Sequence, residues 1–94
     1  MNKPIETIGI IKESRPDENR APLAPIHIEK LKTKYPNLNI LVQPSKNRCF
    51  SEDEYKSKGA EINKDLSNCS IIFGVKEIDT KILINNKTYV FFSH

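Results

Sequence analysis

The stretch Ile71–Glu77 constrains the fold of this chain more than any other part of the sequence. Its first five residues, Ile-Ile-Phe-Gly-Val, form a short apolar run, and a lysine and a glutamate follow directly. An apolar run of this length between polar residues is typical of a central parallel strand that is buried on both faces. Ligands of open α/β sheets bind outside the carboxyl ends of such strands. We therefore expect Lys76 and Glu77 to lie at the lip of a cleft.

Three other segments complete the expected sheet, and each is rich in β-branched or aromatic residues. They are Ile5–Lys12, Asn39–Gln43 and Thr88–Phe92. The last of them is followed only by Ser93 and His94, where the sequence stops.

A helix is expected between the first two strands. Pro25 suits the first helical position because its missing N–H has no partner there, and Pro36 favours an end just before it. Apolar residues recur at helical spacing and form one stripe, made of Ala24, Ile28, Leu31 and Tyr35. His27 falls off this stripe and is expected on the surface.

A second, shorter helix is expected to begin at a capping box formed by Ser51 and Glu54. The pair Lys58–Gly59 ends it, since glycine suits the left-handed position after a helix. The segment 60–62 is expected to be briefly extended, and residues 79–84 to form one or two helical turns.

Strands that alternate with helices predict an α/β fold. We expect an open, doubly wound, mostly parallel sheet of about four strands with flanking helices, of the Rossmann-like or flavodoxin-like kind. Ninety-four residues make one small domain. A parallel strand normally needs a following helix to cover it, and so residues 1–94 are expected to be a single partial domain.

Composition excludes several functional classes. The chain is 37% hydrophobic and 29% charged, which indicates a globular protein. Its net charge of +3 comes from lysines interspersed with acids, so we expect no nucleic-acid partner. No apolar run reaches membrane-spanning length and no signal-peptide core is present, so we expect no membrane partner. Cys49 and Cys69 lack metal or redox spacing and are expected to be reduced thiols of a cytoplasmic protein, with Cys69 packed at the start of the central strand.

Ionisable residues follow three of the expected strands. Since the strands are parallel, their carboxyl ends should meet at one edge of the sheet. That edge would collect Lys12, Glu13, Arg15, Glu18, Arg20, Lys76, Glu77, Ser93 and His94. The alternative is a set of ordinary strand-end charges around a solvated rim.

These residue types suit an amino-acid or oxo-acid substrate. An arginine binds a carboxylate in bidentate fashion. A partly desolvated lysine among other cations loses basicity and can act as a base near neutral pH. A neighbouring histidine can transfer the second proton. By contrast, Gly9, Gly59 and Gly74 are the only glycines, so no glycine-rich loop exists to hold a pyrophosphate, and no metal-ligand cluster is present.

Several phrases resemble a known family. Residues 9–13 (Gly-Ile-Ile-Lys-Glu) and 18–25 (Glu-Asn-Arg-Ala-Pro-Leu-Ala-Pro) resemble the start of the alanine dehydrogenase and transhydrogenase amino-terminal domain family. Its lysine–2-oxoglutarate reductase branch, which forms saccharopine, is most similar. The phrases that carry this likeness are residues 41–45, 48–50, 53–55, 74–77 and 87–94. The resemblance covers nearly the whole chain, in order and with natural spacing.

The resemblance implies an oxidoreductase that condenses lysine with 2-oxoglutarate and reduces the imine to saccharopine with NADP or NAD. It implies that Lys76 and His94 are the catalytic acid/base pair. Arg20 would bind a substrate carboxylate, and Arg15, Glu18 and Glu77 would line the substrate pocket.

Family enzymes continue past this histidine into a separate Rossmann domain that binds the nicotinamide, and the sequence contains no such domain. We therefore expect a substrate-binding half that binds no cofactor by itself and is inactive alone. Its expected partners are the substrates and either further copies of itself or the remainder of the enzyme. Two other functions remain open: an alanine dehydrogenase-type domain that holds pyruvate, and a non-catalytic binding or assembly module.

Overall fold

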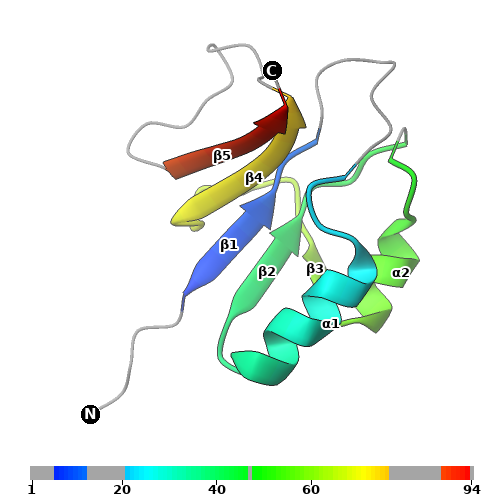
Figure 1. The fold of residues 1–94 in the computed structure, drawn as a ribbon, viewed down its shortest axis with the longest axis vertical. Coiled ribbons are helices and arrows are strands. Elements are labelled where there is room, and N and C mark those ends of the chain that lie inside the picture. Colours follow the sequence, from blue (N-terminus) through cyan, green and yellow to red (C-terminus); the bar gives the residue numbers. More distant parts are fainter. Residues whose placement is uncertain (1–5, 13–20, 47, 77–87, 94) are drawn as a thin grey trace.

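The computed structural model describes residues 6–12, 21–46, 48–76 and 88–93, and it forms one α/β layer structure (Figure 1). The strands are β1 (Thr7–Ile10), β2 (Asn39–Val42), β3 (Glu61–Ile62), β4 (Ile71–Lys76) and β5 (Thr88–Ser93). The helices are α1 (Pro25–Lys34) and α2 (Glu52–Ser57). The expected helical turns at 79–84 lie outside the described residues.

The five strands form one sheet in the order β3-β2-β1-β4-β5, and every neighbouring pair is parallel. The prediction of a parallel α/β fold is thus confirmed. The sheet has one strand more than expected because the segment expected to be briefly extended pairs with β2, through Leu41 with Glu61 and Val42 with Ile62. All strand arrows in Figure 1 point toward the same edge of the sheet.

Helix α1 begins where expected, with Pro25 at its first position. The side chain of Ile28 is fully buried against the sheet, and that of Leu31 is half-buried. The prediction that Tyr35 belongs to the same stripe is wrong, because Tyr35 is 50% exposed. Its backbone leaves helical geometry, with φ −128° and ψ 79°, and so its side chain departs from the apolar face. His27 is exposed, as predicted.

Helix α2 carries the predicted capping box. The Glu54 N–H donates to Ser51 Oγ at 3.2 Å, and the Ser51 N–H donates to Glu54 Oε1 at 3.2 Å. Each bond satisfies a donor that the helix itself leaves without a partner. After the helix, Gly59 has φ +109°, a conformation that side chains disfavour. The predicted stop at Lys58–Gly59 is therefore confirmed.

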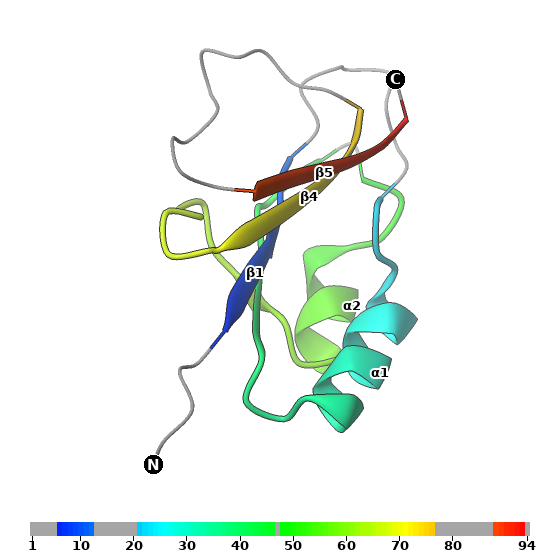
Figure 2. The same cartoon turned by 60° about the vertical axis from the view of Figure 1, so that its left-hand side comes forward.

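Apolar side chains pack on both faces of the sheet. Both helices contribute to the first face, where Ile28 of α1 and Tyr55 of α2 pack against Ile8, Ile10, Ile40 and Val42. Figure 2 shows α1 and α2 together on this side. On the second face, Leu66 and Cys69 of the connection between β3 and β4 pack in one cluster with Ile11, Leu41 and Ile72. Tyr89 and Phe91 of β5 pack against this cluster.

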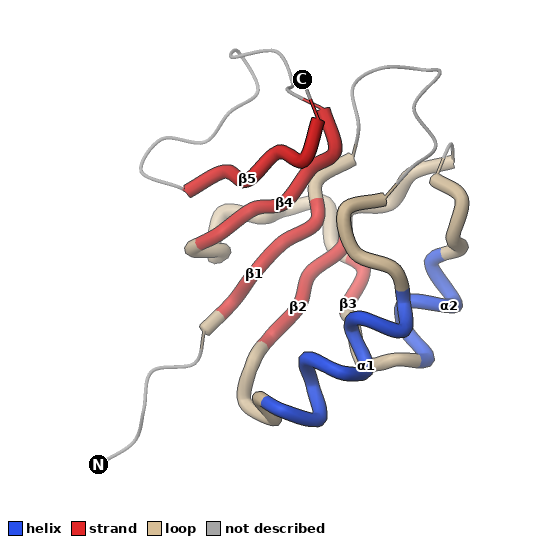
Figure 3. The backbone as a smooth tube through the Cα atoms, viewed as in Figure 1, coloured by secondary structure: helices blue, strands red, loops and turns tan. Residues whose placement is uncertain are grey.

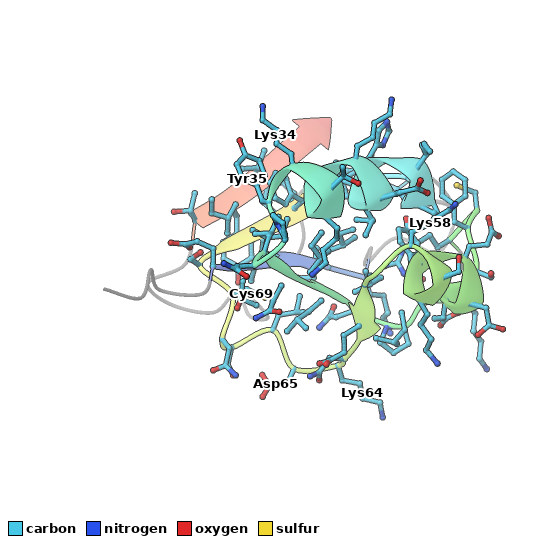
Figure 4. The ribbon with its side chains drawn as sticks, turned by 90° about the horizontal axis from the view of Figure 1, so that it is seen from below. Lys34, Tyr35, Lys58, Lys64, Asp65 and Cys69 are labelled. Carbon is cyan, nitrogen blue, oxygen red and sulfur yellow. The ribbon has the colours of Figure 1, made fainter. Side chains whose placement is uncertain are left out.

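The connection from β3 to β4, residues 63–70, crosses the second face very close to the sheet. A Cβ atom on Gly9 would lie 2.8 Å from Cys69 Sγ and 3.2 Å from the Leu66 methyl carbons. Figure 4 shows Lys64, Asp65 and Cys69 of this connection on the side of the sheet away from α1. Cys69 is fully buried and Cys49 is exposed. Neither forms a disulfide, as predicted. Among the described residues, no helix is both long and apolar enough to cross a membrane.

Replacing Gly9 with alanine should test this close approach. We expect Gly9→Ala to lower the free energy of unfolding by about 1–3 kcal/mol, since the new methyl overlaps Cys69. Removing the sulfur in Cys69→Ala should recover about 1 kcal/mol of that loss in the double variant. Urea unfolding of the four proteins of this cycle measures the coupling. Strictly additive losses would contradict the contact.

Candidate functional site

The candidate site is the carboxyl edge of the sheet around β1 and β4. From β1 the chain proceeds outward to β2 and β3 on one side, and then returns to β4 and β5 on the other side of β1. The point between β1 and β4 is thus where the strand order reverses. In open α/β sheets, ligands bind outside the carboxyl ends of the strands at such a point.

The register of β4 and β5 brings two strand ends together at this edge. The Cα atom of Lys76, the last residue of β4, pairs with that of Ser93, the last residue of β5. On the other side of β4, the Ile11 N–H just after β1 donates to Phe73 O at 3.0 Å. The backbones of β1, β4 and β5 therefore leave the sheet as neighbours.

Most of the site residues predicted from the sequence lie outside the described residues. They are Arg15, Glu18, Arg20, Glu77 and His94. For Lys76 the structure gives the backbone position at the end of β4 but not the side chain. The roles assigned to all six residues therefore stay predictions.

Gln43 ties together the ends of three strands at the described part of this edge. Its Oε1 accepts a 2.8 Å hydrogen bond from the Lys12 N–H after β1, and its Nε2 donates a 2.8 Å bond to Lys64 O after β3. The Gln43 N–H itself donates to Ile10 O at 3.0 Å. Lys12, Gln43, Pro44 and Lys64 line an open hollow of about 360 Å³. One glutamine thus sets the backbone positions of two lysines beside a hollow.

A second network holds the segment that precedes α1. The Tyr55 hydroxyl donates a 2.6 Å hydrogen bond to Leu23 O, and the guanidinium carbon of Arg48 lies 5.6 Å from the centroid of the Tyr55 ring. Arg48 Nη1 donates to Gln43 O at 2.8 Å. Phe50 packs edge-on against Tyr55 with ring centroids 6.2 Å apart. In Figure 3 the start of the loop after β2 lies at the same end of the sheet as this segment. The network thus anchors residues 21–24, which follow directly on Arg20.

Burial raises the pKa of Tyr55 to about 12. The principal cause is the loss of solvation of the phenolate. The Arg48 charge opposes this effect, while Cys49 and Glu54 add to it. Tyr55 is fully buried, so its hydroxyl is a neutral hydrogen-bond donor throughout the physiological range.

Gln43, Arg48, Tyr55 and Lys64 were not identified as site residues from the sequence. Gln43, Arg48 and Tyr55 belong to phrases that carry the family resemblance, but no pattern assigned them a role. Their hydrogen bonds join residues up to 32 positions apart, which local spacing does not reveal. The signal that could have found Lys64 is a cation two residues after a strand. Among the described residues, no group of three or more His, Cys, Asp or Glu gathers at a possible metal site.

Comparison with known proteins identifies the family. Residues 9–94 match the family described as alanine dehydrogenase/PNT, N-terminal domain. The chain belongs to this family. It is 36% identical over 92 residues to alpha-aminoadipic semialdehyde synthase of Arabidopsis thaliana, which covers 93% of this chain and 9% of that protein. The mitochondrial alpha-aminoadipic semialdehyde synthases of Rattus norvegicus and Bos taurus are 42% and 39% identical over 77 residues, covering 82% of this chain and 8% of each protein.

The predicted resemblance to the alanine dehydrogenase and transhydrogenase amino-terminal family is thus confirmed. The curated relatives that the chain matches bear the name alpha-aminoadipic semialdehyde synthase. The chain spans less than a tenth of the length of these curated relatives.

The Tyr55–Leu23 hydrogen bond can be tested by substitution. Tyr55→Phe keeps the buried ring and removes the hydroxyl, so we expect a loss of about 1–2 kcal/mol in the free energy of unfolding at neutral pH. Urea denaturation followed by circular dichroism measures it.

The loss should depend on pH in a defined direction. The pKa of Tyr55 is raised on folding from 10.0 to about 12, so the hydroxyl contributes fully below pH 10 and its contribution is lost as the pH rises through 12. The difference in stability between wild type and Tyr55→Phe should therefore fall by up to roughly 2–3 kcal/mol across this interval, enough to cancel or reverse the advantage of wild type. A constant difference between the two proteins would contradict the raised pKa.

Proposed function

We propose that this chain is the substrate-binding part of an NAD(P)-dependent reductase that condenses lysine with 2-oxoglutarate and forms saccharopine. In this proposal Arg20 binds a substrate carboxylate. Lys76 and His94 transfer protons as the carbinolamine loses water and as the nitrogen of the C=N bond gains a proton when hydride from the nicotinamide adds to the imine carbon. Arg15, Glu18 and Glu77 line the pocket around them.

The observation that carries this proposal is the register between β4 and β5. Neighbouring parallel strands lie about 4.8 Å apart, and the Cα of Lys76 pairs with that of Ser93, the residue before His94. An acid/base pair needs two side chains within reach of the same substrate. The adjacency of these strand ends beside the topological switch point supports that arrangement.

The described residues do not fit a dinucleotide. Binding of a pyrophosphate on an α/β fold uses a glycine-rich turn between a strand and a helix. Here Gly9 lies within β1 and Gly74 within β4, where a Cβ would lie 2.9 Å from the Phe91 ring. Gly59 follows α2. We therefore assign to this chain only substrate binding and proton transfer.

An alanine dehydrogenase-type function is the second candidate, because the family description names that enzyme. Its oxo acid, pyruvate, has one carboxylate, whereas 2-oxoglutarate has two. The names of the relatives favour the lysine branch. A binding or assembly module without chemistry is the third candidate.

Isothermal titration calorimetry with 2-oxoglutarate, saccharopine, pyruvate and alanine separates these functions. We expect the chain to bind 2-oxoglutarate and saccharopine. Arg20→Ala should weaken both by about tenfold to a hundredfold, the range of a charge-assisted hydrogen bond. The matched control Lys34→Gln removes one exposed charge on α1 and should leave both affinities unchanged.

Each other outcome points to a different function. Binding of pyruvate and alanine without 2-oxoglutarate or saccharopine would favour the alanine dehydrogenase type. Binding of none of the four ligands would refute substrate binding and favour the assembly module. Equal affinities in wild type and Arg20→Ala would remove Arg20 from the site.

A further inference from the structure

The described strand ends carry a concentration of positive charge that the net charge of the chain does not suggest. Lys12 follows β1, Lys46 and Arg48 follow β2, and Lys64 follows β3. Among the described residues, other acids lie on the helices, in particular Glu29 on α1 and Asp53 and Glu54 on α2. An edge lined mainly by one sign of charge attracts ligands of the other sign.

Two acids at this edge are already engaged by backbone groups. Glu52 Oε1 accepts a 3.3 Å hydrogen bond from the Ser45 N–H, and Asp65 Oδ1 accepts a 2.9 Å bond from the Ser67 N–H. Lys58 forms an ion pair with Glu29 at 2.7 Å on the helical side of the molecule. In the described part of the chain, Lys12 and Lys64 have no such acidic partner.

The geometry around Lys12 and Lys64 is fixed by one side chain. Both hydrogen-bonding atoms of the Gln43 amide are used, one by the Lys12 backbone and the other by the Lys64 backbone, at 2.8 Å each. The two lysines therefore project from anchored backbone positions on either side of Gln43. This anchoring lowers the conformational cost of holding both charges around one ligand.

The hollow between them differs chemically from another hollow of the same size. Two of the four described residues that line the carboxyl-edge hollow are lysines. The other hollow, also about 360 Å³, is lined by Thr7, Asn39, Ile40, Leu41, Gly59, Ala60, Glu61, Asn63 and Asn68, and these described residues include one acid and no cation. Two lysines in the lining are thus not a general feature of the hollows of this molecule.

We propose that Lys12 and Lys64, held by Gln43, form an oxyanion subsite that takes the distal carboxylate of a dicarboxylic 2-oxo acid. The assignment rests on the proposed function for the identity of the ligand. The same chemistry would accept a phosphate group. The subsite lies over the ends of β1, β2 and β3, and Lys12 follows β1, the strand that flanks the switch point. It provides a means of preferring 2-oxoglutarate over pyruvate, which lacks the second carboxylate.

The test is a nuclear magnetic resonance titration of the full chain with 2-oxoglutarate, pyruvate and inorganic phosphate at low salt. In wild type, 2-oxoglutarate should bind more tightly than pyruvate and shift the backbone amides of Lys12 and Gln43. The double variant Lys12→Gln/Lys64→Gln should bind 2-oxoglutarate and phosphate about fivefold to tenfold more weakly than wild type, as expected for the loss of two solvent-accessible ion pairs. Pyruvate affinity should stay the same.

The double variant Lys30→Gln/Lys34→Gln is the matched control, because it removes two exposed charges from α1. Figure 4 shows Lys34 on the opposite side of the sheet from Lys64. This control should retain wild-type affinity for all three ligands. If the control loses as much affinity for the anions, the effect comes from net charge alone and the proposed subsite is wrong.

The outcomes separate the subsite from the proposed function. Binding of 2-oxoglutarate that depends on Arg20 but not on Lys12 or Lys64 would overturn the subsite and leave the proposed function standing. A second outcome is that wild type binds phosphate but not 2-oxoglutarate, and that Lys12→Gln/Lys64→Gln loses phosphate binding. This result would support an oxyanion subsite, identify its ligand as a phosphate group and count against the proposed function. Absence of binding by all three anions would overturn both.

Discussion

The close crossing of residues 63–70 over Gly9 is the contact on which the arrangement of the sheet depends. To reverse the strand order, this connection must pass from β3 across β2 and β1 to β4, three strand spacings or about 14 Å. It must also return by two residues toward the amino edge, which makes a diagonal of roughly 16 Å. A fully extended segment of this length reaches about 27 Å, so the connection has little slack with which to arch away from the sheet. The segment therefore lies directly on the sheet, and only a residue without a side chain fits beneath Cys69.

That crossing determines where the candidate site lies. Because β4 returns to the side of β1, the carboxyl ends of these two strands flank the switch point. Gln43 and Tyr55 then fix what surrounds it by long-range hydrogen bonds to backbone groups. Backbone acceptors and donors have set positions once the sheet has formed, so such bonds anchor loops more firmly than contacts between two mobile side chains. The packing of the second face and the arrangement of the edge are thus linked through one connection.

Local patterns in the sequence were sufficient for most of the fold. The apolar run of β4 and the capping box of α2 are short-range signals, and both elements form where predicted. Tyr35 shows where such signals fail: helical spacing placed it on the buried stripe, but the helix ends one residue earlier. The pairing of β3 with β2 also escaped prediction, because two residues carry too little pattern and the pairing is decided by neighbours in space.

For the candidate site, the sequence predicted only its position at the carboxyl edge of the sheet. Parallel strands bring their carboxyl ends to one edge, and this much followed from the alternation of strands and helices. The bonds of Gln43 to Lys12 and Lys64 depend on side-chain geometry between strands that are distant in sequence, and no spacing rule reveals them. The chemical roles proposed for Lys76 and His94 came from resemblance, and the register of β4 with β5 supports the proposal with a physical argument.

The charge pattern of the edge is better explained by ligand binding than by stability. Like charges at neighbouring strand ends repel one another, and among the described residues most of the acids lie on the helices instead. A domain this small has little stability to spare. Repulsion among the cations at this edge therefore destabilises the folded state unless an anion binds there. An anion that binds relieves the repulsion, and this relief strengthens its binding. This coupling is typical of binding sites, where function is gained at the expense of stability.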